Sequence, residues 1–199
     1  KRYRENGELR EIGSYKDGER EGEWKTYHRN GKLFDIGSYK DGKKDGEWKY
    51  YHYSGKLSSI GSYKDGKREG EWQKYHKNGK LKEIVYYKNG NPEGVQKYYY
   101  HGNGKLREIR SYKDGKQEGE WQKYDKNGKL KSTETYRAGK FDDEYKMYHD
   151  NGILKEIGSY EDGKKDAEWK FYDQSGKIKE ISSYKDGKRE GEWQKYHKN

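Results

Sequence analysis

A tryptophan recurs at a fixed spacing along the 199-residue chain, and this repeat constrains the fold more than any other feature. Residues 61–84, GSYKDGKREGEWQKYHKNGKLKEI, represent the repeating unit. Neighbouring tryptophans are 24 residues apart, or 48 or 49 residues apart where one copy lacks the tryptophan. The six tryptophans are Trp24, Trp48, Trp72, Trp121, Trp169 and Trp193. A fixed period in this range indicates a repeat architecture, in which each unit packs on its neighbours.

Each copy contains two turn signals, an Asp-Gly and an Asn-Gly dipeptide, as at Asp17-Gly18 and Asn30-Gly31. Both dipeptides suit a two-residue type I′ hairpin turn, in which both central residues have positive φ. The segments between the turns have 11 and 9 residues, and with the two turns they fill the 24-residue period. No residues remain for a helix. We therefore predict an all-β repeat protein, an elongated single-layer antiparallel β-meander of about 16 strands, two per repeat.

Counting outward from the Asn-Gly turn places Trp24 opposite Gly37, and we expect the indole to cover this cross-strand glycine. Both hairpins then place Trp24 and Tyr15 on one face without a bulge. The Glu21-Gly22 step is nevertheless a candidate β-bulge, which would shift the register. We interpret the six tryptophans as a structural ladder that holds a thin sheet together. The alternative is a sheet curled into an open trough with the tryptophans inside.

The composition favours an ordered chain with little conventional core. Hydrophobic residues make up 27% of the chain and charged residues 41%, which is typical of disorder. Aromatic residues oppose disorder, because they reach 16% and include 23 tyrosines. The chain has no cysteine, so disulfides and thiolate chemistry are excluded. No apolar run approaches the length of a membrane span, and no signal peptide is visible, so the compartment stays open.

The net charge of +10 leaves a second class of partner open. Positive and negative residues are interspersed, which is typical of a solvated face. A basic, aromatic surface nevertheless attracts anionic lipid or nucleic acid, and binding of either is an alternative function.

Three copies depart from the pattern, in residues 91–100, in residues 138–145, and at Ala167, which replaces the glycine before Glu-Trp. The first lacks the tryptophan and carries one inserted residue, and the second has tyrosine in its place. Local rules tend to break at functional sites, although neutral drift would produce the same departures. The candidate partner-binding residues are Pro92, Tyr98, Tyr99, Tyr100, Phe141, Asp142, Asp143 and Tyr145.

Catalysis and metal binding find little support in the residue pattern. The histidines form a column at His28, His52, His76, His101, His149 and His197. Equivalent positions lie two strands apart, roughly 9–10 Å, whereas a shared metal needs donors within about 2.0–2.2 Å. We expect a polar ladder beside the turn, with no metal and no cofactor. A thin sheet also lacks a concave cavity for catalysis, so we expect no enzyme activity.

A motif within each copy resembles a known family. It reads Gly-x-x-x-Gly-Glu-Trp, with Tyr three residues after Trp and then Asn-Gly-Lys-Leu. In this chain it stands as Gly18, Gly22-Glu23-Trp24, Tyr27 and Asn30-Gly31-Lys32-Leu33. The motif resembles the MORN repeat, in particular the bacterial MORN-variant family often labelled antitoxin-like, over nearly the whole chain. The resemblance implies a single-layer β-meander, a role in binding proteins or membranes, and no enzyme activity of the repeats.

We therefore expect a non-catalytic repeat scaffold that mediates protein–protein interaction, with a toxin or effector as the partner if the role is antitoxin-like or immunity-like. A structural spacer or fibre element is a further alternative. Residues 1–199 are interpreted as one continuous array of about eight MORN-like repeats, with both ends cutting a repeat. Open sheet edges would then allow end-to-end self-association. The identity of the partner and the face that binds it stay open.

Overall fold

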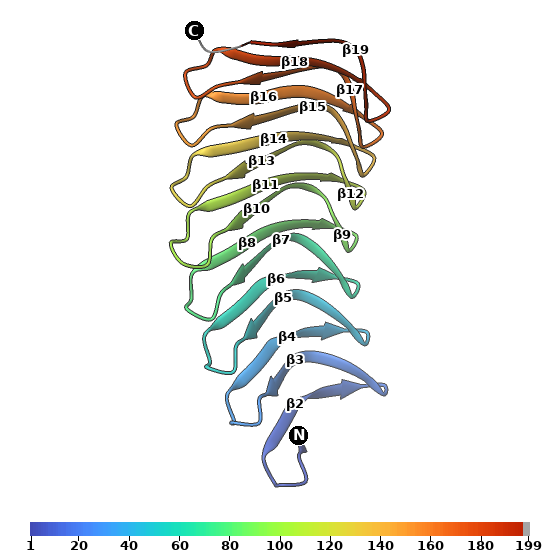
Figure 1. The fold of residues 1–199 in the computed structure, drawn as a ribbon. Helices are drawn as coiled ribbons and strands as arrows, with labels where there is room; N and C mark the ends of the chain where they lie inside the picture. The colour runs from blue at the N-terminus through green and yellow to red at the C-terminus, as the bar shows by residue number, and fades with distance from the viewer. Residues whose placement is uncertain (197–199) are drawn as a thin grey trace. The chain divides into compact units, whose positions relative to one another are not determined.

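The computed structural model describes residues 1–196, and this range contains no helix. Its 19 β-strands belong to an antiparallel sheet in meander order (Figure 1). The predicted all-β meander is confirmed. The strand number exceeds two per repeat because two long strands are each broken in two and a short strand precedes the first repeat. These additional breaks separate β9 from β10 and β12 from β13, and the short strand is β1.

The chain divides into two compact units, Lys1–Gly94 (unit 1) and Val95–Asn199 (unit 2). In unit 1 each strand pairs with the next in chain order. Its strands are β1 (Arg2–Tyr3), β2 (Leu9–Lys16), β3 (Glu19–Tyr27), β4 (Leu33–Lys40), β5 (Lys43–Tyr51), β6 (Leu57–Lys64), β7 (Lys67–Tyr75), β8 (Leu81–Lys88) and β9 (Asn91–Pro92).

Unit 2 follows the same order, with β11 pairing with both halves of the broken strand that follows it. Strand β10 begins at the last residue of unit 1. The strands are β10 (Gly94–Tyr99), β11 (Leu106–Lys113), β12 (Lys116–Gln117), β13 (Gly119–Tyr124), β14 (Leu130–Arg137), β15 (Lys140–Tyr148), β16 (Leu154–Glu161), β17 (Lys164–Tyr172), β18 (Ile178–Lys185) and β19 (Lys188–Lys195).

The two turn signals behave differently. Asp17 and Gly18 have φ of 49° and 83°, as a type I′ turn requires, so the prediction is confirmed for Asp-Gly. At Asn30-Gly31 only the glycine has positive φ, and the predicted two-residue turn is wrong. The loop is longer, because the His28 N–H donates to the Lys32 carbonyl.

The asparagine of this loop connects neighbouring repeats. Its side-chain Nδ2–H donates to the carbonyl of Tyr53 at 2.8 Å, and its Oδ1 accepts from the Lys32 N–H at 3.2 Å. Asn103 and Asn151 donate in the same way to carbonyls of the following repeat. Asparagine is therefore placed here for its side chain rather than for a left-handed backbone.

The register between β3 and β4 pairs Trp24 with Gly37, as predicted. Between β2 and β3 the expectation of an unbroken register is wrong. Ile12 pairs with Lys25 but Ser14 pairs with Glu21, so three residues of β3 stand opposite one residue of β2. The candidate bulge at Glu21-Gly22 is confirmed, and Gly22 lies in the left-handed region at φ 69°.

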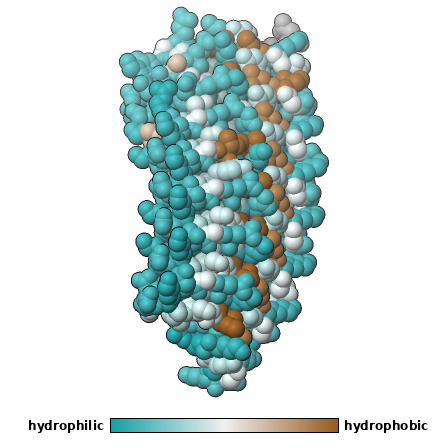
Figure 2. Space-filling view, turned by 180° about the vertical axis from the view of Figure 1, so that it is seen from behind, coloured by the Kyte–Doolittle hydropathy of each residue, from teal (hydrophilic) through white to brown (hydrophobic). Residues whose placement is uncertain are grey.

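The interior is thin. Seven hydrophobic residues are buried within the described range, and five of them are tryptophans. They are Trp24, Trp48, Trp72, Val85, Trp121, Tyr145 and Trp169. Figure 2 shows that the apolar side chains on the face seen from behind form a narrow stripe between hydrophilic margins. Packing between neighbouring repeats, rather than a thick core, therefore carries the hydrophobic burial in each unit.

Candidate interaction surface

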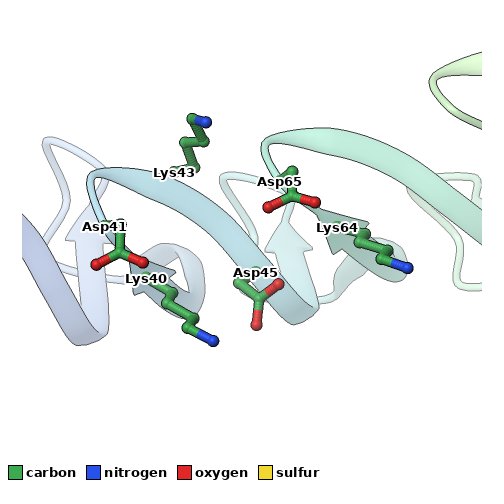
Figure 3. A pocket seen from close by; sticks show the side chains of 6 residues that line it. All are labelled: Lys40, Asp41, Lys43, Asp45, Lys64 and Asp65. Atoms are coloured by element: carbon green, nitrogen blue, oxygen red, sulfur yellow. The ribbon is translucent and has the colours of Figure 1, made fainter.

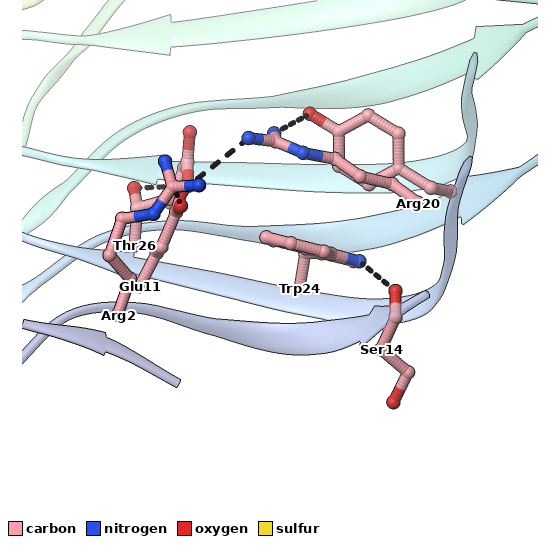
Figure 4. Close-up of polar contacts among 8 residues, drawn as sticks. Arg2, Glu11, Ser14, Arg20, Trp24 and Thr26 are labelled. Carbon is pink, nitrogen blue, oxygen red and sulfur yellow. Dashed lines mark hydrogen bonds and ion pairs between the residues drawn. The ribbon is translucent and has the colours of Figure 1, made fainter. Parts of the chain in front are cut away.

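The tryptophan face is the side of the sheet on which the indole rings lie. The ring of Trp24 covers Gly13 of β2, where an added Cβ would come within 2.2 Å of the indole. Its Nε1–H donates to the Ser14 carbonyl at 3.1 Å (Figure 4). In the same way Trp48 covers Gly37, Trp72 covers Gly61 and Trp169 covers Gly158. Only glycine leaves room for an indole this close to the backbone.

This seating corrects one expectation about the ring. Gly37 is the backbone partner of Trp24, but the ring that covers Gly37 is that of Trp48. The bulge is the reason, because it sets the segment ending at Trp24 opposite Gly13 of the preceding strand. Each of these four indoles therefore packs on the strand that precedes its own strand in the chain.

A cation four residues before each of four buried tryptophans lies over its ring. The Arg20 guanidinium carbon lies 4.3 Å from the ring centroid of Trp24, and Lys44 Nζ lies 3.8 Å from that of Trp48. The corresponding distances are 4.7 Å for Arg68 over Trp72 and 3.6 Å for Lys165 over Trp169. Since the glycine backbone occupies one face of each ring, the cation takes the other. The cation column comprises Arg20, Lys44, Arg68, Lys165 and Arg189.

A second column lies nine residues before the first, across each Asp-Gly hairpin. Glu11 accepts from Arg20 at 3.5 Å and from Arg2 at 3.0 Å, and it is 7% exposed (Figure 4). Glu180 and Arg189 form the same pair at 2.8 Å. The carboxylate column has eight positions, with serine at Ser59 and Ser132 and carboxylates at Glu11, Asp35, Glu83, Glu108, Glu156 and Glu180. Buried carboxylates need such partners, so each of these two ion pairs stabilises its own hairpin.

Lys44 is enclosed by aromatic rings. Its Nζ donates to the Tyr50 hydroxyl at 2.7 Å, and the Tyr50 and Tyr63 hydroxyls are 3.0 Å apart. Burial lowers the pKa of Lys44, and the nearby Arg20 and Arg68 lower the pKa further. Burial likewise raises the pKa of Tyr50. The tryptophan face therefore carries a partly desolvated positive group in unit 1.

The predicted residues of the first irregular copy are half-buried. In unit 1, Pro92 of β9 pairs with Tyr87 near the end of β8. In unit 2, the Arg110 guanidinium lies 4.6 Å from the Tyr98 ring, and the Tyr100 hydroxyl donates to a backbone carbonyl at 2.7 Å. Tyr99 is a half-buried residue of β10.

The structure brings Phe141 and Tyr145 of the second irregular copy together, with ring centroids 5.9 Å apart. Phe141 takes the cation position and Tyr145 the tryptophan position, so the two substitutions occur in one step of the ladder. Phe141 also contacts Tyr136 and Tyr160. Tyr145 is 9% exposed.

The two aspartates of this copy share one cation. Arg137 lies 3.4 Å from Asp142 and 3.6 Å from Asp143. Asp143 stands at the bulge with φ 73°, where the other copies have glycine except for Ala167 in the seventh. This strain accompanies the loss of the tryptophan in the same copy.

The fifth copy replaces the covered glycine itself. Arg110 stands at that position, and its guanidinium lies 4.7 Å from the Trp121 ring. Gln117 occupies the usual cation position, so the cation comes from the neighbouring strand instead. The interplanar angle between Tyr112 and Trp121 is 46°, whereas Tyr63 and Trp72 meet at 85°. The indole therefore tilts where glycine is absent.

The histidines form the expected polar ladder in three described copies. Nε2 of His28, His52 and His149 lies 3.0–3.1 Å from the carbonyl of the tyrosine 23 residues later. Because a carbonyl can only accept, this nitrogen donates. Residues 1–196 contain no group of three or more His, Cys, Asp or Glu residues that could hold a metal ion. His197 lies outside the described residues.

Asp125 takes a histidine position but caps its own loop. Its Oδ1 accepts from the Lys129 N–H at 2.9 Å, and this bond lowers the pKa of Asp125. The polar positions beside the loops are therefore occupied by structural hydrogen bonds, within one loop or between repeats.

A glutamate on the long strand caps the next Asp-Gly turn. Glu21 accepts from the Asp41 N–H at 3.1 Å, and Glu69 accepts from the Asn89 N–H at 2.9 Å. Asp45 stands at the same position with a shorter side chain. A polar cavity of about 310 Å³ lies there, lined by Lys40, Asp41, Lys43, Asp45, Lys64 and Asp65 (Figure 3). A cavity of about 280 Å³ recurs beside Asp166.

The cation column is not among the predictions from the sequence, although its signal is present there. Five of the six tryptophans have Lys or Arg four residues earlier, and Trp121 is the exception. The regular alternation of a strand places residues four apart on the same face. The bulge between them is a candidate in the sequence, but only the structure shows that it leaves the cation directly over the ring.

None of the described residues forms a helix long and apolar enough to cross a membrane. A search of curated proteins gives no match. The sequence model of the family described as "MORN repeat variant" matches eight stretches, well over half of the chain. They are residues 1–17, 20–41, 44–65, 68–89, 92–114, 117–138, 144–162 and 165–186. MORN repeats generally serve as non-catalytic scaffolds for protein or lipid interaction. From these matches and the repeated strand pairs, the chain belongs to the MORN repeat variant family.

Proposed function

We propose that the chain is a non-catalytic repeat scaffold that binds another protein through its tryptophan face. The cation column carries this proposal. The Arg20 guanidinium donates to the Tyr39 hydroxyl at 3.0 Å, and Arg68 donates to the Tyr87 hydroxyl at 3.0 Å. Arginine and tyrosine are enriched at the energetic centres of protein interfaces, and groups already held in place lose less entropy on binding.

The tryptophan rings themselves offer little to a partner. Trp24, Trp48 and Trp72 are 3%, 1% and 0% exposed. A partner would instead meet the half-buried cations and tyrosine hydroxyls above the rings. Binding then sums many modest contacts that recur once per repeat.

The narrower form of this proposal is an antitoxin-like or immunity-like role, in which the partner is a toxin or effector. The resemblance to the MORN-variant family supports this form. The net charge of +10 favours a partner with an acidic surface. No catalytic step is assigned to the chain.

The alternative function is binding of anionic lipid or nucleic acid, which the same net charge favours. The two functions differ in their dependence on salt. Affinity for a nucleic acid falls about 10³–10⁵-fold between 50 and 200 mM salt when 6–10 phosphates are contacted. A partner held mainly by packed and hydrogen-bonded contacts loses much less.

The test begins with capture of a partner from the cell of origin and its purification. The affinity of the purified pair is then measured by calorimetry for the natural chain and for Arg20→Gln/Arg68→Gln. Lys40→Gln/Lys64→Gln removes the same charge at exposed strand ends beside the turns and serves as the control. We expect about a tenfold or greater loss for the arginine pair alone. Equal losses in both variants would contradict binding through the tryptophan face, and filaments without any captured partner would favour a structural spacer.

A further inference from the structure

We propose that hairpin β6–β7 carries a recognition site for a carboxylate side chain of an acidic partner segment, centred on Arg68. The site deepens the proposed function and rests on it, because it names the chemistry of the partner.

The sequence supplies a carboxylate for the column cation in most hairpins, and Glu11 with Arg20 and Glu180 with Arg189 form ion pairs. Four of the five cations have a carboxylate nine residues earlier, across the Asp-Gly turn. The four pairs are Glu11 with Arg20, Asp35 with Lys44, Glu156 with Lys165, and Glu180 with Arg189. Arg68 is the exception among the five, because Ser59 stands in its carboxylate position.

The remaining hairpins are balanced by other means. Ser132 and Phe141 take the carboxylate and cation positions of one hairpin, so neither column charge is present there. Glu83 has no cation in its own hairpin, but Lys74 of the preceding strand pairs with it at 2.5 Å. Glu108 pairs with Arg110 at 2.8 Å. In the described chain, Arg68 is therefore the column cation for which the sequence supplies no carboxylate in its hairpin.

The surroundings of Ser59 suit an incoming carboxylate. Ser59 pairs with Tyr50 on one neighbouring strand and with Lys74 on the other. Arg68 lies over Trp72 and is half-buried, which fixes the guanidinium above the sheet.

The equivalent hairpin shows how a carboxylate is held at this position. Glu11 lies between Arg2 and Arg20, at 3.0 and 3.5 Å. A carboxylate from a partner would take the corresponding place beside Arg68. Charge-assisted hydrogen bonds from a planar guanidinium fit the two oxygens of a carboxylate, and they are stronger than neutral ones.

An acidic protein segment fits better than a polyphosphate backbone. The missing carboxylate of this hairpin corresponds to one side-chain position, Ser59, in a column that otherwise holds mostly aspartate and glutamate. A polyphosphate backbone would need further cations without a carboxylate along its length, whereas the other column cations have one in their own hairpins. A single Asp or Glu side chain needs only this one position.

The experiment uses a fluorescein-labelled hexaglutamate peptide and fluorescence anisotropy at pH 7, with hexaglutamine as the uncharged peptide. Arg68→Gln removes the guanidinium, and Ser59→Glu supplies the missing carboxylate from within the chain. The controls are Lys40→Gln, which removes one exposed positive charge at a strand end, and Ser132→Glu, whose hairpin has no column cation. We expect both test variants to weaken hexaglutamate binding about tenfold and both controls to stay within about twofold. Thermal melts confirm that each variant folds, and Ser59→Glu should melt above the natural chain.

Three results would overturn the site. The first is equal binding by all variants, which would mean attraction to net charge alone. The second is a loss in Ser132→Glu as large as that in Ser59→Glu. The third is tripolyphosphate displacing hexaglutamate from the natural chain but not from Arg68→Gln, at concentrations where free glutamate has no effect, which would assign the site to phosphate.

Failure of the site and failure of the proposed function are distinguishable. If the purified native partner binds Arg68→Gln as tightly as the natural chain while hexaglutamate does not, the site holds but lies outside the natural interface. If the partner depends on the cation column but hexaglutamate fails to bind, the proposed function stands and the carboxylate site is wrong.

Discussion

Gly61→Ala perturbs the contact on which each repeat depends. Gly61 lies in β6 beneath the indole of Trp72, and a Cβ added there would lie 2.3 Å from Cδ2 of the ring. Carbon atoms in contact are ordinarily about 3.5–4.0 Å apart, so the ring has to move by about 1 Å or more. Because neighbouring strands hold the ring on both sides, we expect a large effect from one methyl group.

The magnitude follows from the burial of Trp72, which is 0% exposed. A buried tryptophan removes roughly 150–250 Å² from water, worth about 4–6 kcal/mol at about 25 cal/mol per Å². Partial loss of this contact and the strain of an overpacked site lead us to expect a decrease of about 2–3 kcal/mol in the free energy of unfolding. Trp121 tilts beside Arg110, and a similar tilt of Trp72 would bring the decrease toward the lower end of this range.

The assay is urea unfolding followed by tryptophan fluorescence and far-UV circular dichroism, with hydrogen exchange resolved over β6 and β7. Gly102→Ala is the matched control, because a Cβ there meets no atom within 4 Å and the residue has no positive φ. A change of less than about 0.5 kcal/mol for Gly61→Ala would refute the seating of the indole on glycine.

Three further predictions concern the bulge, the turn edge and a buried tyrosine. Ala167 lies at the bulge with φ 58°, so Ala167→Gly should raise the free energy of unfolding by about 0.5–1 kcal/mol in urea titrations; a decrease would contradict the strain. Asp45→Glu should cap the Asp65 turn as Glu21 caps the Asp41 turn, and it should raise the free energy of unfolding by about 0.5–1 kcal/mol. An unchanged urea midpoint would show that the bond does not form. Burial raises the pKa of Tyr136 from 10.0 to about 12, so the folded state holds this proton more tightly and stability should fall as pH rises between these values. The fall should be smaller in Tyr136→Phe, and an equal fall in both proteins would assign it to other groups.

The strand arrangement could be predicted from the sequence because it follows from short-range rules. Asp17-Gly18 requires a two-residue turn whatever surrounds it, and the pairing of Trp24 with Gly37 follows from counting. The two-residue turn predicted at Asn30 is wrong because the role of this residue is not local. Its side chain bonds to the loop of the next repeat, which a turn rule does not include.

The surface of the tryptophan face could not be predicted in the same way. The bulge at Gly22 decides which glycine lies under each ring and which cation lies over it. The spacing between Arg20 and Trp24 is visible in the sequence, but its meaning depends on that bulge. The serine at position 59 became informative only once Glu11 and Arg20 were found paired across the same hairpin.

The most direct test of the tryptophan ladder is hydroxyl-radical footprinting of the folded chain, read for each tryptophan by mass spectrometry. Trp193 is 49% exposed, whereas Trp24, Trp48, Trp72, Trp121 and Trp169 are 0–4% exposed. We predict rapid oxidation of Trp193 and strong protection of the other five, which become equal to Trp193 in urea. Comparable oxidation of all six tryptophans in the folded chain would mean that the rings face solvent, and it would contradict a ladder of indoles held between glycine and cation.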